Sequence, residues 1–112
     1  MDQKLKNFII ATLRRASYRW SARTEAMRLA RIERGLYKCA HCKGEFKRKQ
    51  VHVDHINPVI DIKKGFTNWD DFINRLFCKV EQFQVLCEQC HSAKTSTERS
   101  LRTIYRKKRK LV

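Results

Sequence analysis

The sequence lacks the apolar segments that would place it in or across a membrane. Spanning a bilayer takes about 20 consecutive apolar residues, and the apolar patch at residues 8–13 is short and flanked by charged side chains. The N-terminus also lacks the small-residue cleavage site that follows the apolar core of a secretory signal. These absences argue against a membrane-spanning or secreted protein and predict a cytoplasmic location.

Proline and glycine are scarce, with one proline and three glycines in the chain. Neither occurs in residues 4–34, and the chain has no low-complexity linker. Apolar residues recur there at helical steps of three and four: Ile9, Leu13, Ala16 and Trp20. We therefore predict one or two helices over residues 4–34, with a possible break near Ser21 and Gly35 as the C-terminal cap.

Acidic residues are few, since 11 Asp and Glu stand against 26 Lys and Arg, which gives a net charge of +15. Such a charge suits a polyanion, and nucleic acid is the commonest one. An anionic membrane surface is a weaker alternative, and a solvated face is the alternative for any single residue. The basic residues that we expect to contact phosphates gather near both ends: Arg14, Arg15, Arg19, Arg23, Arg106, Lys107, Lys108, Arg109 and Lys110.

The chain has 112 residues and five cysteines. That length suits one domain, and small domains often need a metal or disulfides for stability. The odd number argues against a complete disulfide framework, while two Cys-x-x-Cys pairs are typical of a structural zinc site in a reducing compartment. The pairs are Cys39 with Cys42 and Cys87 with Cys90, and we interpret Cys78 as a small buried apolar residue.

The segment between the two cysteine pairs is long enough to form structure of its own. Residues 47–54 predict a strand with Val51 and Val53 on one face and His52 and Asp54 on the other. Residues 59–62 suggest a second short strand. Residues 67–78 predict a helix capped by Thr67 or Asn68, and a terminal helix is expected from near Cys90 to about Arg106, followed by a frayed basic tail.

Asp54, His55 and His91 remain after the four cysteines have been assigned to a metal. A carboxylate and an imidazole can hold a divalent cation that leaves room for a phosphate oxygen and a water. A separate neutral histidine can take the proton of that water. A structural role is the alternative for each residue alone, but the combination indicates phosphodiester hydrolysis.

Three segments together resemble the zinc-containing HNH endonucleases common in phages. They are Cys39-Ala40-His41-Cys42, Val53-Asp54-His55-Ile56-Asn57-Pro58, and the run from Leu86 to Thr95. The resemblance covers about residues 36–97. It implies an α+β fold with a ββα-metal core, a β-hairpin and a helix around one catalytic ion, which a structural zinc on four cysteines would stabilise. We expect a basic helical leader over residues 1–35, the nuclease core over 36–100, and the end of the C-terminal helix with the basic tail over 101–112.

The resemblance also implies roles for single residues. Asp54 and His91 would bind the catalytic ion, and His55 would be the general base. The family usually has an asparagine shortly before the second Cys-x-x-Cys, where it orients the general base, and the nearest substitute here is Gln82. His52 is expected beside the site or at a phosphate, and two further basic residues are expected at backbone phosphates: Lys94 and Arg99.

The sequence therefore predicts a metal-dependent endonuclease that nicks double-stranded DNA through backbone contacts, with weak sequence preference. Mg²⁺ is the expected catalytic ion, while Mn²⁺, Ni²⁺ or Co²⁺ would also suit a site that contains imidazole. Two alternatives are a non-catalytic zinc-containing module that binds nucleic acid and an accessory subunit of a phage packaging or restriction complex. For a phage protein, the expected location is the cytoplasm of the host cell.

Overall fold

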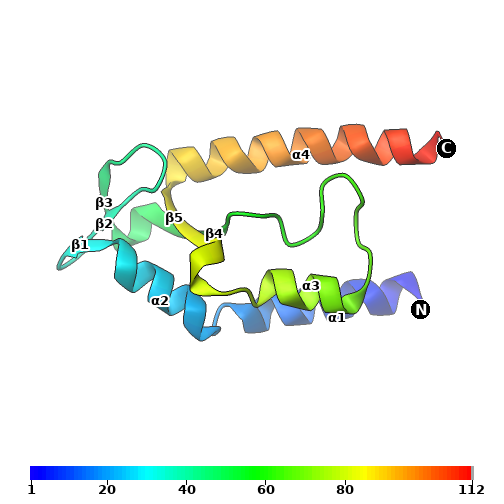
Figure 1. Ribbon diagram of the computed structural model, residues 1–112, viewed down its shortest axis with the longest axis horizontal. Helices are drawn as coiled ribbons and strands as arrows, with labels where there is room; N and C mark the ends of the chain where they lie inside the picture. Colours follow the sequence, from blue (N-terminus) through cyan, green and yellow to red (C-terminus); the bar gives the residue numbers. More distant parts are fainter. Residues whose placement is uncertain (112) are drawn as a thin grey trace.

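A computed structural model describes residues 1–111 and confirms the α+β class (Figure 1). The helices are α1 (Gln3–Ser17), α2 (Ser21–Ala30), α3 (Trp69–Leu76) and α4 (Glu88–Lys110). One antiparallel sheet contains β1 (Arg31–Glu33), β2 (Leu36–Lys38) and β3 (Glu45–Lys47), and a second contains β4 (Val51–His55) and β5 (Phe83–Cys87). Two 3₁₀ turns, Arg48–Gln50 and Val80–Gln82, precede β4 and β5.

The N-terminal segment forms two helices with the break where the sequence predicts it. The indole Nε1 of Trp20 donates a 2.7 Å hydrogen bond to the carbonyl of Cys78, which anchors the turn between α1 and α2. Gly35 is not the helix cap that we expected, because α2 ends at Ala30 and a strand follows. Gly35 lies instead in the turn between β1 and β2, where its φ of +78° suits glycine.

The two-stranded sheet lies between α2 and α4. Its register runs from Val51 opposite Cys87 to His55 opposite Phe83. On one face, Val51 and Val85 pack against Met27 of α2, and all three side chains are buried. Because successive strand residues point to opposite faces, the alternate residues His52 and Asp54 lie on the face that meets α4.

The strand expected at residues 47–54 is divided in the structure. Its first residue ends β3 in the three-stranded sheet, the 3₁₀ turn Arg48–Gln50 follows, and β4 begins in the other sheet at Val51. The side-chain Oε1 of Gln50 accepts a 2.9 Å hydrogen bond from the backbone N–H of Lys47, which closes this turn. The chain therefore changes sheets within a segment whose alternation predicts one continuous strand.

The prediction of a strand at residues 59–62 is wrong, because this segment is part of a loop with a single isolated bridge between Asp61 and Gly65. The carboxylate of Asp61 accepts hydrogen bonds from the backbone N–H groups of Lys63 (2.9 Å) and Lys64 (2.8 Å). This local bonding turns the backbone away from a strand conformation.

The helix after this loop is shorter than predicted but begins at the expected cap. The side chain of Asn68 accepts a 2.8 Å hydrogen bond from the backbone N–H of Asp71. Phe72 and Leu76, each 1% exposed, bury the inner face of α3 against Val59 and against partly buried side chains of α1. This cluster attaches α1 and α3 to the base of the loop.

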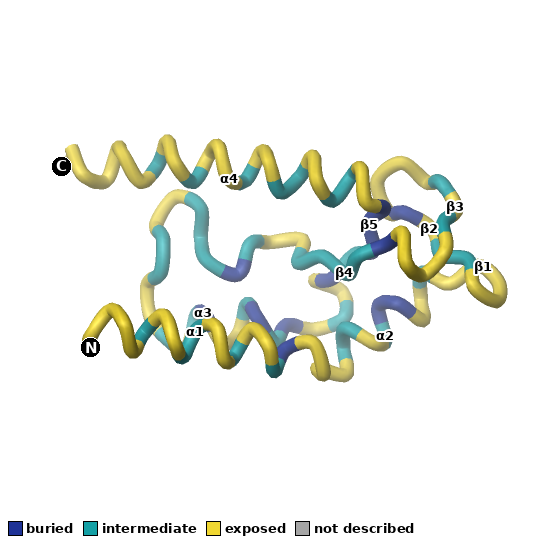
Figure 2. Tube along the Cα trace, turned by 180° about the vertical axis from the view of Figure 1, so that it is seen from behind, coloured by how far each residue is buried: buried dark blue, intermediate teal, exposed yellow. Residues whose placement is uncertain are grey.

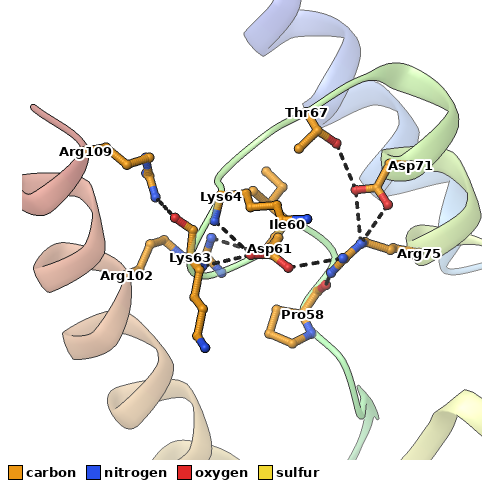
Figure 3. A network of polar contacts seen from close by, with 10 residues as sticks. All are labelled: Pro58, Ile60, Asp61, Lys63, Lys64, Thr67, Asp71, Arg75, Arg102 and Arg109. Atoms are coloured by element: carbon orange, nitrogen blue, oxygen red, sulfur yellow. Dashed lines mark hydrogen bonds and ion pairs between the residues drawn. The ribbon is translucent and has the colours of Figure 1, made fainter. Parts of the chain in front are cut away.

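Arg75 of α3 holds the loop in place through a polar network (Figure 3). Its guanidinium donates to the carbonyl of Pro58 at 3.0 Å and to the carboxylate of Asp61 at 3.3 Å. From the opposite side, Arg102 and Arg109 of α4 donate to the loop carbonyls of Ile60 and Lys63. The loop is therefore fixed between α3 and α4.

The C-terminal helix is longer than predicted, because α4 begins at Glu88 and continues through the basic tail to Lys110. Its hydrogen bond from Arg109 to the loop explains in part why the tail is helical rather than frayed. In Figures 1 and 2, α4 lies along one side of the molecule and α1 along the other, and the loop lies between them. No helix among residues 1–111 is long and apolar enough to cross a bilayer.

Candidate functional site

Four cysteines from two distant segments form one cluster, as the sequence predicts. Cys39 and Cys42 lie in the turn between β2 and β3, Cys87 ends β5, and Cys90 lies in the first turn of α4. Their sulfurs all lie within 4.8 Å of one another, with Cys42 and Cys87 at 3.9 Å. Tetrahedral zinc with Zn–S bonds of about 2.3 Å would separate its sulfurs by about 3.8 Å. The four cysteines could therefore hold a structural metal ion such as zinc.

Local backbone contacts shape this cysteine turn. The N–H of Cys39 donates to the carbonyl of Gly44 at 3.0 Å, and Lys43 adopts a positive φ of 66°. A Cβ at Gly44 would lie 2.8 Å from the ring of Phe46, so a larger residue would force a shift there. The N–H of Ala40 donates to the carbonyl of Val85 at 2.8 Å, which fastens the turn to β5.

The electrostatics of the thiols favour a cation at their centre. Burial opposes ionisation of Cys39, but hydrogen bonds from the backbone N–H groups around it outweigh burial and lower its pKa to about 6. Burial and the neighbouring sulfurs raise the pKa of Cys90 to about 12. Each thiolate in the cluster thus disfavours the ionisation of its neighbours. A bound divalent cation would offset this repulsion, because it stabilises every thiolate at once. Cys78 lies apart from the cluster in the apolar core, as expected.

Asp54, His55 and His91 line one cavity of about 540 Å³. Asp54 and His55 end β4, while His91 lies in the first turn of α4. Among residues 1–111, however, only the four cysteines place three or more metal-ligating atoms within 4.8 Å of one another. The structure thus brings the three residues to a common cavity without joining all three in a single ligand shell.

The carboxylate of Asp54 is already engaged by two donors. The side-chain Nε2 of Gln84 lies 3.0 Å from Oδ2, and the Nζ of Lys94 lies 3.1 Å from the same oxygen. Lys94 also donates to the carbonyl of His55 at 3.0 Å and to the carboxylate of Glu98. Burial acts to lower the pKa of Lys94, but the hydrogen bonds to Glu98 and Asp54 outweigh burial and raise it. An ammonium group therefore occupies a position surrounded by oxygens.

The imidazole of His55 is held by a backbone carbonyl. Its Nε2 lies 3.0 Å from the carbonyl oxygen of Leu76, and because a carbonyl only accepts, Nε2 carries the proton. Burial lowers the pKa of His55, and the cations of Arg23 and Arg14 add to that effect. His55 is therefore neutral at pH 7 and has a free lone pair on Nδ1.

Among residues 1–111, no hydrogen bond joins Gln82 to this ring. Its side-chain Oε1 accepts a 3.2 Å hydrogen bond from the backbone N–H of Lys79, and its carbonyl accepts a 3.0 Å bond from Ile56. The residue expected to orient His55 therefore closes the 3₁₀ turn before β5, and the partner of the ring is Leu76. The sequence could not identify Leu76 as this partner, because every residue has a backbone carbonyl and the residue type does not show which carbonyl lies close to the ring.

His52 lies beside His91, where the sequence places it as a neighbour of the site. The two rings stack with centroids 4.6 Å apart and planes inclined by 19°. His52 also forms a hydrogen bond through Nε2 with the carboxylate of Glu88, and this hydrogen bond lowers the pKa of that carboxyl group. The stack with His52 restricts the orientation of the His91 ring.

The basic residues singled out in the sequence fall into three groups. Some line a second cavity of about 360 Å³, which also contains Asp54 and His55: Arg14, Lys94, Arg99 and Arg106. Arg102 lines it as well and was missed, although its place between Arg99 and Arg106 on one helix face was a usable signal. Others are on the surface of α4 or in the turn after α1: Arg19, Lys107, Lys108 and Lys110.

Three remaining arginines are engaged within the chain. Arg15 donates to the hydroxyl of Thr12 at 3.3 Å on the exposed side of α1. Arg23 donates to the carbonyl of Val53 at 3.2 Å and lies over the ring of Tyr18. Arg109 bonds the loop, as described above. These contacts give each of the three arginines a partner within the chain, while the buried Nε of Arg23 has no hydrogen-bond partner among residues 1–111.

No protein-family model matches this chain, and no curated protein or solved structure matches it. The functional interpretation therefore depends on the geometry of the cysteine cluster and the two cavities.

Proposed function

We propose that this protein is a metal-dependent DNA endonuclease of the HNH type, with β4, β5 and α4 as its ββα-metal core. The observation that carries the proposal is the meeting of Asp54, His55 and His91 at one cavity. A neutral histidine beside a carboxylate and a second imidazole supplies both a proton acceptor and metal ligands. The surrounding positive charge suits a phosphodiester substrate.

Asp54 and His91 are the residues that would hold the catalytic ion. Their donor set of one carboxylate and one imidazole accepts Mg²⁺, and it also suits Mn²⁺, Ni²⁺ or Co²⁺. An ion bound there supplies charge stabilisation for the phosphate oxygens and for the departing 3′ oxygen. The ring of His91 stacks on the ring of His52, which restricts the rotation of the His91 side chain.

His55 is the general base in this proposal. Its Nδ1 takes a proton from a water as the water oxygen bonds to phosphorus. The bond from phosphorus to the 3′ oxygen breaks, and the departing oxygen takes a proton from solvent. The products are a 5′-phosphate and a 3′-hydroxyl, as the resemblance to the family implies. The hydrogen bond from Nε2 to Leu76 fixes the tautomer that leaves Nδ1 free.

A structural zinc on the four cysteines has a positioning role in this scheme. It would join the cysteine turn to the end of β5 and the start of α4. Because His91 directly follows Cys90, the metal would also fix the place of His91 relative to β4. The zinc would thus act on catalysis through geometry and not through direct contact with the substrate.

A plasmid-nicking assay tests the proposal. Zinc-loaded protein is incubated with supercoiled plasmid and Mg²⁺, Mn²⁺, Ni²⁺ or Co²⁺ in turn. His55→Ala should lower the nicking rate by roughly 10²–10⁴-fold, the usual contribution of a general base. His41→Ala is the matched control, since His41 is exposed in the cysteine turn and lines neither cavity that contains Asp54. Equal rates for His55→Ala and the wild type would refute the proposed role.

One observation favours a second candidate, a non-catalytic module that binds nucleic acid. The ammonium of Lys94 already neutralises Asp54, so the chain satisfies this carboxylate without a metal ion. This candidate predicts DNA binding with no nicking under any of the four ions, by the wild type and His55→Ala alike. An accessory subunit would instead nick only after its partner protein is added.

A further inference from the structure

Two arginines from opposite ends of the chain meet at the 360 Å³ cavity. Arg14 comes from α1 and Arg102 from α4, and the cavity also contains Asp54 and His55. Burial, and after it the positive charge of Arg102, lowers the pKa of Arg14, so the two guanidinium groups are close enough to repel each other. The fold therefore brings two like charges together beside the candidate catalytic residues.

These charges are not neutralised within the described chain. The guanidinium of Arg102 donates to a neutral group, the carbonyl of Ile60, at 3.2 Å. Among residues 1–111, the guanidinium of Arg14 has no hydrogen-bond acceptor and no ion-pair partner. The two carboxylates of the cavity, on Asp54 and Glu98, are both engaged by Lys94. An unpaired cationic pair of this kind is stabilised when an anion binds between its members.

The walls of the cavity suit a segment of nucleic-acid backbone. Five cationic side chains and two carboxylates give the lining a net charge of +3 when His55 is neutral. The apolar side chains of Pro58, Val59 and Ile60 line it as well, and they can lie against a sugar. A cavity of this volume is within the usual range for small ligands, and planar guanidinium groups bind phosphate oxygens through paired hydrogen bonds.

The loop that contributes these apolar residues is rigidly supported. Arg75 bonds the carbonyl of Pro58 from the side of α3, and Arg102 bonds the carbonyl of Ile60 from the side of α4 (Figure 3). Because α1 and α4 run along opposite sides of this loop (Figure 1), a strand that follows the loop would pass between the two helices. Because the loop is already held in place, little conformational entropy is lost there when a ligand binds.

We propose that Arg14 and Arg102 form a clamp that binds one backbone phosphate of the DNA. The adjacent phosphate of the same DNA strand then lies at Asp54 and His55. The substrate strand then passes through the cavity that Arg14, the loop and α4 line. The position of the cleaved phosphate rests on the proposed function, whereas the binding of a phosphate by the clamp does not require catalysis.

Binding measurements test the clamp without catalysis. The anisotropy of a fluorescent oligonucleotide, single-stranded or as a duplex, is followed with zinc-loaded protein and no added divalent ion. Arg14→Gln and Arg102→Gln should each raise Kd about tenfold at low salt and reduce the slope of log Kd against log salt by about 1, as expected for one lost phosphate contact. Arg31→Gln is the matched control, because Arg31 of β1 is exposed and lines neither cavity that contains Asp54, and it should change Kd less than about twofold.

Folding defects are separated by thermal unfolding, since Arg102→Gln also loses a bond to the loop whereas Arg14→Gln loses none. Loss of affinity by folded Arg14→Gln on either oligonucleotide supports the clamp, and the more affected oligonucleotide identifies the bound form. Equal Kd values and equal salt slopes for Arg14→Gln, Arg31→Gln and the wild type would overturn it.

The outcome is distinct from that of the nicking assay. If the wild type never nicks DNA but Arg14→Gln still weakens binding, the clamp stands and the endonuclease proposal fails. If the wild type nicks DNA, Arg14→Gln should raise KM about tenfold with kcat within about twofold, because the clamp holds substrate and transition state alike. A fall in kcat at unchanged KM would contradict a role confined to phosphate binding.

Discussion

Lys94→Met removes the ammonium group that lies among three oxygens at the end of β4. In the wild type, this group contacts the carboxylates of Asp54 and Glu98 and the carbonyl of His55. Methionine retains an unbranched apolar side chain of similar length, so the packing of the stem is kept while the charge is lost. The carboxylate of Asp54 then retains only Gln84 as a side-chain donor in the described chain.

The expected loss of stability follows from the burial of the three side chains. Lys94, Asp54 and Glu98 are 24%, 11% and 22% exposed. Exposed ion pairs contribute up to about 1 kcal/mol, and breaking a fully buried pair costs about 3–5 kcal/mol. An intermediate cost of about 2–3 kcal/mol is expected, which lowers Tm by about 10 °C in a domain of this size.

Added Mg²⁺ should reverse part of this loss if the oxygens of this site can hold a divalent ion. The vacated position in Lys94→Met leaves two carboxylates without a cation, so the variant should bind Mg²⁺ more tightly than the wild type does. Ligand at about tenfold its Kd stabilises a protein by about 1.4 kcal/mol, or about 6 °C here. Thermal unfolding of zinc-loaded protein, followed by circular dichroism with and without Mg²⁺, measures both effects.

Lys107→Met is the matched control, since Lys107 is an exposed lysine on the same helix. It should leave Tm within about 2 °C of the wild type, as surface substitutions usually do. A Tm of Lys94→Met as high as that of the control would show that the ammonium contributes nothing to stability. An equal effect of Mg²⁺ on the variant and the wild type would show that Lys94 does not compete for a cation.

Two further predictions concern the cysteine cluster and the pH. A strong chelator, or Cys87→Ser, should abolish cooperative unfolding and the near-UV circular dichroism signal, because structural zinc contributes about 10–16 kcal/mol in small domains; an unchanged unfolding curve would count against a metal there. Burial lowers the folded-state pKa of His55, so the unfolded chain binds more protons below about pH 6.5 and stability should fall as the pH drops from about 6.5 through the folded pKa. Urea unfolding should show a smaller fall over this interval for His55→Gln, and parallel curves would contradict the effect.

The helices and the cysteine cluster could be predicted because each depends on a local pattern. Apolar periodicity predicted one or two helices where α1 and α2 lie, and of the two expected caps, Thr67 and Asn68, it is Asn68 whose side chain bonds the start of α3. The spacing of the cysteine pairs indicated four ligands, and the structure brings them together. In these cases, the information lies within a few neighbouring residues.

The short strands and the polar contacts of the site could not be predicted in this way. β1 has only three residues, all exposed, so it shows no alternation that a sequence could reveal. The meeting of Arg14 and Arg102 depends on how α1 and α4 are packed around the loop, and the bond of His55 goes to a backbone atom of α3. Lys94 was expected at a phosphate, but its carboxylate partners lie on its own helix and on β4.

The alternation of β4 gives the strand two chemically different sides. Asp54 pairs with Gln84 beneath α4, and the next residue, His55, packs its ring against Phe83 with centroids 4.7 Å apart. A shift of one residue within a strand exchanges its two faces. A one-residue insertion inside β4 would thus bring a carboxylate against an aromatic ring and an imidazole opposite an ammonium group. The 3₁₀ turn Arg48–Gln50 lies just before β4, so its length can change without exchanging the two faces of the strand.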